Sequence, residues 1–407
     1  MRYRRGLTLV LAWALAAVLP CRGGEDVAAG SPSLSLKGFG TLGIARSTND
    51  SVQYVRDLSQ PDGVNKHWSS QVDSILGLQA NLHLSELTEG VVQVVSRYSY
   101  DGTYTPTVAW AFLSHDFSPQ ISVRAGRLGT EFYMLADSRL VGYANLTVRP
   151  PPDYYGSLVF SYINGMDVSA TTPVGEGLLR GKFYAGLSEE KVPFNINKLL
   201  WDLEDSLIVG GHVDYLHGPW QFRLGHAQIR FKNEIPLDAL AASLGGPPGF
   251  LSYAPELSAA GKWSQFNSLG VVYDNGPLQL QLMLSQTRHE SAIYENSKAG
   301  YVIAAYRLGQ VTPYLGYSKV KSSAKTLASP PPAPLAPLAA GLMAQTHSDQ
   351  HTLFLGGRWD IQPDLALKAQ VDWIRGTPSS LFPFHGDYAP AWNGNLTVFS
   401  LALDFVF

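Results

Sequence analysis

The chain has 407 residues, of which 45% are hydrophobic and only 15% are charged, and its formal net charge is −3. This low charged fraction excludes a disordered chain and a nucleic-acid-binding protein, because both classes are rich in charge. The single cysteine, Cys21, excludes a disulfide framework and a cysteine-based zinc site. The 39 glycines and the many aromatic residues favour β structure.

The first 29 residues are expected to be a signal peptide that is cleaved. Basic residues precede an apolar run over 7–19, and an A-x-A-like site follows at 27–29. Residues 30–407 then form the mature chain, which loses Cys21 with the leader. No later part of the sequence is apolar over about 18 consecutive residues, so a membrane crossing would need strands closed into a barrel.

Segments in which apolar and polar residues alternate predict the strands. In the clearest segment, 278–284, leucine occupies every second position. Several segments alternate over ten residues or more, which is long for a soluble sheet and typical of a tilted membrane-spanning strand. The predicted strands are 33–45, 72–84, 90–100, 106–117, 120–128, 163–172, 177–188, 206–217, 219–232, 263–275, 277–290, 298–308, 310–322, 350–361, 364–376 and 395–407.

The connections between these strands alternate between short and long. Short turns include Gly218-Pro219 and Gln362-Pro363, whereas long loops cover 46–71, 129–162, 189–205, 233–262, 323–349 and 377–394. Short periplasmic turns and longer extracellular loops are typical of outer-membrane barrels, whereas a secreted β-sandwich has no reason to sort its loops by length. The sequence therefore predicts an all-β fold, a closed antiparallel transmembrane β-barrel of about 16 strands. A short helix is expected over 236–245 in one long loop, with Gly245 as its stop.

The last strand carries an ending that resembles a known signal. Five apolar residues share one face of it: Phe399, Leu401, Leu403, Phe405 and Phe407. This pattern resembles the C-terminal assembly signal of Gram-negative outer-membrane barrels. Together with the leader, the strand count and the loop alternation, it makes the whole mature chain resemble a sixteen-stranded, trimeric general porin. The resemblance implies a bacterial outer-membrane location, contact with membrane lipids, a homotrimer, and recognition of the last strand by the barrel-assembly machinery.

The segment after the fifth strand adds a local resemblance. Arg124 and Arg127 end that strand, and a long loop over about 129–162 follows. In porins the third external loop folds into the barrel and narrows the channel, so the resemblance implies an inward-folded constriction loop here. Glu131 and Asp137 are candidates for its acidic side.

A basic group is expected to line this constriction. Strand parity turns Arg124, Arg180 and Lys182 inward. Arg127 breaks the parity, so a bulge near the strand end is required to turn it inward. Fixed positive charge in a narrow passage attracts anions, so an anion-leaning pore is expected, although ordinary solvated charges are the alternative. The full set of expected pore-lining residues is Arg124, Arg127, Glu131, Asp137, Arg139, Arg149, Arg180 and Lys182.

The sequence lacks the common motifs of nucleotide, zinc-protease and serine-hydrolase sites, so no enzymatic activity, cofactor or metal is expected. The expected function is a water-filled channel for passive diffusion of small hydrophilic solutes and ions. Two alternatives remain open. One is a substrate-specific channel, and the other is a plugged barrel with a structural, adhesin or hydrolase role. A hydrolase would use pairs such as His289 with Ser291 or Ser114 with His115.

Overall fold

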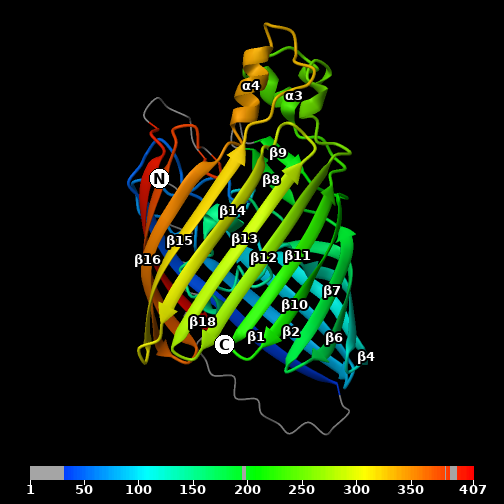
Figure 1. Ribbon diagram of the computed structural model, residues 1–407, viewed down its shortest axis with the longest axis vertical. Helices are drawn as coiled ribbons and strands as arrows, with labels where there is room; N and C mark the ends of the chain where they lie inside the picture. Colours follow the sequence, from blue (N-terminus) through cyan, green and yellow to red (C-terminus); the bar gives the residue numbers. More distant parts are fainter. Residues whose placement is uncertain (1–31, 195–198, 381, 386–391) are drawn as a thin grey trace.

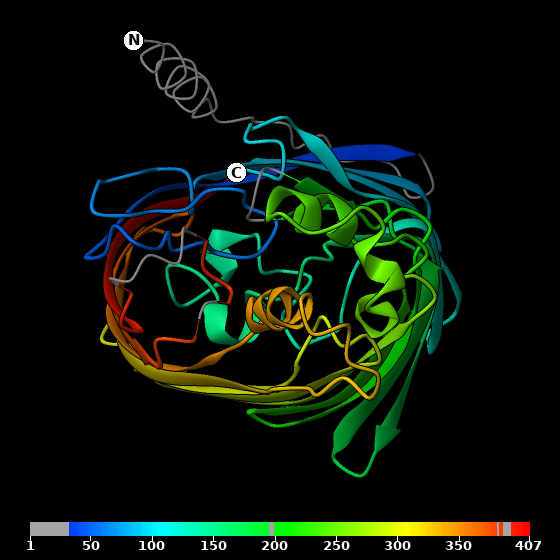
Figure 2. The ribbon, with the colours of Figure 1, turned by 90° about the horizontal axis from the view of Figure 1, so that it is seen from above.

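A computed structural model describes residues 32–194, 199–380, 382–385 and 392–407. Sixteen antiparallel strands close into one barrel, which Figure 1 shows from the side and Figure 2 from above. The fold class and the strand number predicted from the sequence are thereby confirmed. The expected leader, residues 1–29, lies outside the described residues, so its cleavage stays a prediction.

The wall of the barrel is made of strands of 9 to 15 residues. In chain order they are β1 (Ser33–Ser47), β2 (Ile75–Ser85), β3 (Thr88–Arg97), β4 (Thr107–Ser118), β5 (Ile121–Gly129), β6 (Tyr162–Val174), β7 (Gly177–Leu187), β10 (Leu207–His217), β11 (Trp220–Arg230), β12 (Trp263–Asn275), β13 (Leu278–His289), β14 (Asn296–Tyr306), β15 (Val311–Ser323), β16 (Asp349–Gln362), β17 (Leu365–Gly376) and β18 (Asn395–Val406). The remaining pair, β8 (Lys191–Phe194) and β9 (Leu199–Asp202), forms a separate hairpin in a loop.

The first and last strands close the barrel. β1 pairs with β18 in an antiparallel register that runs from Phe39 opposite Val406 to Ser47 opposite Val398. Beyond this register, the backbone N–H of Gly38 donates to the carbonyl of Phe407 at 2.7 Å. Closure pairs the backbone groups that a sheet edge would leave free, which a membrane requires.

Side chains alternate between the two faces of the wall. Along β15 every second residue is exposed, including Leu315 and Tyr317, while the residues between them are buried. The outer face therefore carries an apolar band. Trp220, Tyr306 and Trp359 are exposed near its turn end, where an outer-membrane barrel places an aromatic girdle.

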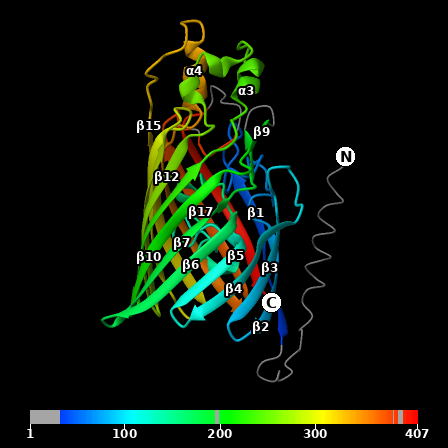
Figure 3. The same ribbon diagram turned by 90° about the vertical axis from the view of Figure 1, so that its right-hand side faces the viewer.

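The long connections leave the wall at one end of the barrel and the short turns lie at the other, as predicted. The long loops rise at the top of Figures 1 and 3, where α3 (Leu237–Ser243) and α4 (Ala336–Ala344) project. The expected helix over 236–245 is thus present as α3, and Gly245 follows it with a φ of +83°. Within the described part of the chain, no helix is long and apolar enough to span a membrane.

Candidate functional site inside the barrel

The connection between β5 and β6, residues 130–161, lies inside the barrel, as Figure 2 shows. We call it the inserted loop. It contains two short helices, η1 (Gly142–Ala144), which contacts β1 and β18, and α2 (Pro152–Tyr155), which contacts β14, β15 and β16. The loop therefore reaches the wall opposite the strands from which it starts.

Arg149 is a fully buried anchor of the inserted loop. Its Nε donates to Asp73 Oδ1 at 2.8 Å, and its Nη1 lies 3.3 Å from Asp372 Oδ2. Its Nη2 donates to Ser400 Oγ at 2.6 Å. The Arg149 side chain is 0% exposed, and those of Asp73 and Asp372 are 1% and 3% exposed. A buried charge is tolerated only when it is paired in this way, so Arg149 fixes the loop to the wall.

Lys368 on β17 forms a second anchor. Its Nζ lies 2.8 Å from Asp404 Oδ2 and donates to the carbonyl of Gly142 at 2.7 Å. A side chain cannot replace the hydrogen of Gly142, because a Cβ there would lie 2.1 Å from Thr41 Oγ1. The loop backbone is therefore in direct contact with the wall.

Asp153 on α2 forms a third set of contacts, in which its partners on the wall are neutral side chains. Its carboxylate accepts hydrogen bonds from Ser318 Oγ at 2.6 Å, Gln350 Nε2 at 2.7 Å and Thr352 Oγ1 at 2.8 Å. Burial raises the pKa of Asp153 above its ordinary value, although these hydrogen bonds oppose the change. The neighbouring Tyr154 packs edge-on against Tyr301 of β14, with ring centroids 5.3 Å apart.

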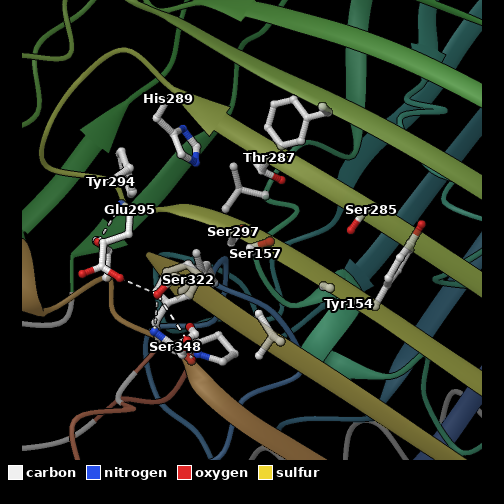
Figure 4. Close-up of a pocket in the computed structure, with 18 of the residues that line it drawn as sticks. Tyr154, Ser157, Ser285, Thr287, His289, Tyr294, Glu295, Ser297, Ser322 and Ser348 are labelled. Atoms are coloured by element: carbon white, nitrogen blue, oxygen red, sulfur yellow. Dashed lines mark hydrogen bonds between the residues drawn. The ribbon is translucent and has the colours of Figure 1, made fainter. Parts of the chain in front are cut away.

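A small cavity of about 90 Å³ remains between α2 and the wall on the loop side of the barrel. Figure 4 shows its lining, which includes Tyr154, Ser285, His289 and Glu295. The volume holds a few water molecules at most and is far smaller than an ordinary ligand pocket. The cavity is therefore a packing gap beside the inserted loop.

The structure does not assemble either of the expected hydrolase pairs. His289 Nδ1 lies 2.6 Å from Ser264 Oγ, whereas Ser291 Oγ donates to the carbonyl of Leu257 at 3.0 Å. Ser114 and His115 are adjacent on β4, and adjacent strand residues point to opposite faces. Neither His289 with Ser291 nor Ser114 with His115 therefore forms a contact between a nucleophile and a base.

Lys182 and two arginines gather around Glu131 at the start of the inserted loop. The Glu131 carboxylate lies 2.6 Å from Lys182 Nζ, 3.4 Å from Arg223 Nη1 and 3.5 Å from Arg124 Nη2. Burial alone would raise the pKa of Glu131, but Lys182, His212 and Arg223 outweigh burial and bring the pKa down to about 2. Glu131 is therefore ionised throughout the physiological pH range.

In the group around Glu131, the carboxylates that pair with the arginines are more deeply buried than the arginines themselves. Asp167 accepts from Arg124 Nε at 3.0 Å, and Asp214 accepts from Arg223 Nε at 2.6 Å. The side chains of Asp167 and Asp214 are 3% and 0% exposed, whereas that of Arg124 is 26% exposed. The charges nearest to water in this group are therefore positive.

Water reaches the inner face of the barrel unevenly. Inward side chains on β2, β5, β6 and β7 are partly or fully exposed, namely Gln79, Asn81, Ser122, Ser169, Thr171 and Arg180. On the other half of the wall the inward side chains are mostly buried, among them Ser268, Tyr314, Ser318, Gln370 and Ala402. Polar, water-accessible side chains therefore lie on the inner faces of β2, β5, β6 and β7, whereas the inward Val91, Gln93 and Val95 of β3 are buried. We call this surface the face along β2–β7.

The expected inward orientation of Arg127 is wrong. β5 keeps an unbroken register with β4 and β6 through this position, so the bulge that the prediction required is missing. Arg127 consequently points to the face opposite Arg124. Its guanidinium lies over the Tyr162 ring at 4.2 Å and pairs with Glu189 on the outer side of the wall.

The remaining expected residues divide between two environments. Arg180 is exposed on the inner face, and Asp137 is exposed on the inserted loop. Arg139 is buried, and it donates to the carbonyls of Ala136 at 3.1 Å and Phe160 at 3.0 Å. Like Arg149, it holds the inserted loop together instead of facing water. The expected set omitted Arg223 and His212, although strand parity and the pairing of Asp214 opposite Arg223 identify both as inward.

Glu190 gives the inserted loop a dependence on pH. Its Oε1 accepts from the backbone N–H of Ser161 at 2.8 Å, and its buried Oε2 has no hydrogen-bond partner among the described residues. Burial raises the pKa of Glu190 from 4.5 to about 7. The folded protein therefore retains a proton that the unfolded chain releases above pH 4.5, so the contribution of Glu190 to stability is largest below that pH and is lost as the pH rises through 7.

Replacing Glu190 with glutamine is expected to abolish this part of the pH dependence. The wild-type protein should lose at most about 3 kcal/mol of unfolding free energy between pH 5 and pH 8, and the variant should lose none of that amount. Urea unfolding of the detergent-solubilised protein measures the difference. Glu189→Gln is the matched control, because the Glu189 side chain is 48% exposed. An equal pH dependence in wild type and Glu190→Gln would refute the assignment.

Comparison with known proteins gives a result at the level of structure. No protein-family model matches the chain, and no curated protein matches it in sequence. An anion-selective porin from Comamonas acidovorans is 16% identical, with a TM-score of 0.56 over 93% of this chain and 100% of that chain. OmpF of Salmonella typhi, in complex with daunomycin, is 12% identical, with a TM-score of 0.55 over 92% and 97%.

The outer-membrane channel DcaP of Acinetobacter baumannii is also similar, with 12% identity and a TM-score of 0.54 over 93% of this chain and 100% of that chain. All three matches cover nearly the complete barrel. At these identities the comparison establishes the fold and nothing more specific. The chain therefore has the sixteen-stranded fold of outer-membrane porins.

Proposed function

We propose that the protein is a bacterial outer-membrane channel through which small hydrophilic solutes and ions diffuse passively. The observation that carries this proposal is a closed barrel with an apolar outer band and a polar, water-accessible inner face along β2–β7. An apolar exterior suits lipid, and a polar interior suits a water-filled passage. Conductance steps in a planar lipid bilayer test the proposal, and a folded protein that gives no steps would refute it.

The inserted loop is the proposed constriction. It occupies the half of the lumen in front of β14–β18 and leaves the face along β2–β7 in contact with water. Its charged anchors, Arg149 and Lys368, hold it firmly against the wall. A rigid loop in this position narrows the passage and makes it selective by size.

A preference for anions is part of the proposal. Arg180 is exposed, and Arg124 and Lys182 are 26% and 14% exposed, whereas the carboxylates paired with them are buried. Positive charge nearest to water in a narrow passage favours anions. The similarity to a porin described as anion-selective agrees with this assignment.

Arg180→Gln is expected to shift the reversal potential toward cation permeation, because Arg180 is an inward, exposed cation without an ion-pair partner among the described residues. A bilayer with a tenfold salt gradient measures this shift. Arg127→Gln removes the same charge from the outer face and should leave the reversal potential unchanged. Equal shifts in the two variants would show that the inner face does not set selectivity.

A substrate-specific channel is the second candidate. It is favoured by the inserted loop, whose buried Tyr154 packs against Tyr301 of β14 and so narrows the lumen, since a narrow passage gives close contact with a solute. Saturable flux and a solute that blocks conductance would support it. Flux that rises linearly with solute concentration would favour passive diffusion.

The assembly of the protein is also proposed from its last strand and its fold. Phe399 and Leu401 are 41% and 42% exposed on the outer face of β18, where assembly machinery can bind them before insertion. We further propose a homotrimer, as the resemblance to general porins implies. The mass of the detergent-extracted complex tests the trimer, and the mass of the mature subunit tests cleavage before Gly30.

A further inference from the structure

Three lysines lie together on the outer face of the barrel, near the loop ends of two neighbouring strands. Lys298 is on β14, and Lys319 and Lys321 are on β15. All three are exposed and share the outward parity of Val302 and Tyr317. They follow Tyr317 toward the long loops, so they lie where the apolar band gives way to polar residues. Figure 1 shows β13–β15 on the side that faces the viewer.

The arrangement of these lysines is unfavourable for the protein alone. Lys298 and Lys321 are directly opposite each other in the register of β14 and β15. Like charges at directly opposite positions, with Cβ atoms about 5 Å apart, destabilise a sheet. Within the described residues, neither Lys298 nor Lys319 has an ion-pair partner, and Lys321 Nζ lies 3.4 Å from Asp349 Oδ2. An anion bound between the lysines would remove this repulsion.

An apolar groove begins directly beside the lysines. It is open to the outside, has a volume of about 510 Å³ and is lined by Leu282, Leu284, Val302 and Tyr317, together with the three lysines. Gly300 lies between Lys298 and Val302 on the outward face, and its lack of a side chain leaves the groove open there. The groove therefore has apolar walls and three positively charged lysines at one end.

This combination identifies one class of ligand. A soluble anion would use the lysines and leave the groove empty, whereas a lipid with a phosphate headgroup uses both. The groove lies on the outward face, and its leucine side chains belong to the apolar band that acyl chains cover. Lysines near a membrane surface attract anionic headgroups, and their alkyl stems tolerate apolar surroundings.

We propose that Lys298, Lys319, Lys321 and the groove over Gly300 form a specific binding site for a phosphorylated lipid of the outer leaflet. An acyl chain occupies the groove, and the phosphate lies between Lys298 and Lys321 with Lys319 beside it. The site requires the proposed membrane location, but it does not depend on conduction through the barrel.

Native mass spectrometry of the protein in a neutral detergent tests the site. The probes are phosphatidic acid and phosphatidylcholine with identical acyl chains, which separate a phosphate monoester from a zwitterionic headgroup. The variant Lys298→Gln/Lys319→Gln/Lys321→Gln is expected to bind phosphatidic acid roughly a hundredfold more weakly than wild type. The control variant Lys66→Gln/Lys191→Gln/Lys232→Gln removes three positive charges from loops and should bind like wild type.

Several outcomes would overturn the proposal. Equal binding of phosphatidic acid by the triple variant and wild type would remove the lysines from the site. Equal binding of phosphatidylcholine would show that the groove does not select phosphate, and full competition by inorganic phosphate would show an anion site without a lipid.

Stability in detergent without added lipid provides a second measurement. Lys298→Gln should melt at the same or a higher temperature than wild type, because it relieves the repulsion and leaves the Lys321–Asp349 ion pair intact. Addition of phosphatidic acid should then stabilise wild type more than the variant. A lower melting temperature of the lipid-free variant would assign the lysines a structural role and refute the site. Conductance should be unchanged in these variants, so a failure of the lipid site is distinguishable from a failure of the channel.

Discussion

Replacing Arg149 with methionine is expected to detach the inserted loop from the wall and to raise the single-channel conductance. The substitution leaves the buried carboxylates of Asp73 and Asp372 without their shared cation. Breaking a buried ion pair on one side costs about 3–5 kcal/mol, because the remaining charge is desolvated and unpaired. Arg56 Nη1 still lies 3.8 Å from Asp73 Oδ1, but Asp372 keeps no ion-pair partner among the described residues, so the loop is expected to move away and admit water to it. A wider passage should follow, with larger and noisier current steps.

The variant Arg149→Lys tests whether the positive charge at this position is enough, or whether the hydrogen-bonding geometry of the guanidinium is also needed. Lysine retains the positive charge but cannot bond Asp73, Asp372 and Ser400 at once, as the guanidinium does. Its conductance should therefore lie between those of wild type and Arg149→Met. The heat resistance of the folded barrel, measured by gel mobility, should fall in the same order. Wild-type conductance in a folded Arg149→Met protein would show that the loop does not limit the passage.

Deleting Phe407 is expected to remove most of the folded protein from the outer membrane. The Phe407 ring occupies the space beside Gly38, where a Cβ would lie 2.1 Å from the ring, and it stacks on Phe405 with centroids 6.3 Å apart. Backbone hydrogen bonds join Phe407 to Gly38 in both directions, at 2.7 and 3.0 Å. The deletion thus removes the last contacts between β18 and β1 together with the terminal aromatic residue of the proposed assembly signal.

The yield of heat-modifiable barrel in isolated outer membranes measures this effect. Phe117→Ala is the control, since Phe117 is also an outward aromatic side chain near a turn and is 68% exposed. Refolding of both variants from urea into detergent separates the two contributions. A refolding defect as large as the defect in cells would assign the effect to barrel closure alone. Normal membrane yield without Phe407 would refute its part in assembly.

The wall of the barrel could be predicted because its pattern is local. Strand β13 was expected over 277–290 and spans Leu278–His289. Leucines at alternate positions all lie on one face of a strand, so the pattern by itself identifies the strand and its outward face. The sixth strand, expected over 163–172, spans Tyr162–Val174. The separation of short turns from long loops then fixed the direction of every strand.

The site could be predicted only in part, because loops follow no period. Arg149 was expected to line the pore, and nothing in the sequence links it to Asp73 and Asp372, which are distant along the chain. Arg127 was misplaced because a bulge was assumed where the register is regular. Strand parity correctly predicted that Lys182 points into the barrel. Parity cannot show that Glu131 of the inserted loop pairs with Lys182 and neutralises part of the lysine's charge.

The most direct test of the channel is the current through variants that carry one cysteine, recorded before and after addition of an anionic methanethiosulfonate. Cys21, the single cysteine of the sequence, lies in the expected leader, so Cys21→Ala gives a thiol-free background whether or not the leader is cleaved. Ser169 lies on the water-accessible inner face of β6, whereas Ser318 on β15 points inward but is only 1% exposed. We expect stable open steps from both variants and a loss of current only from Ser169→Cys. A folded protein without open steps, or block of Ser318→Cys alone, would contradict a water-filled passage along β2–β7.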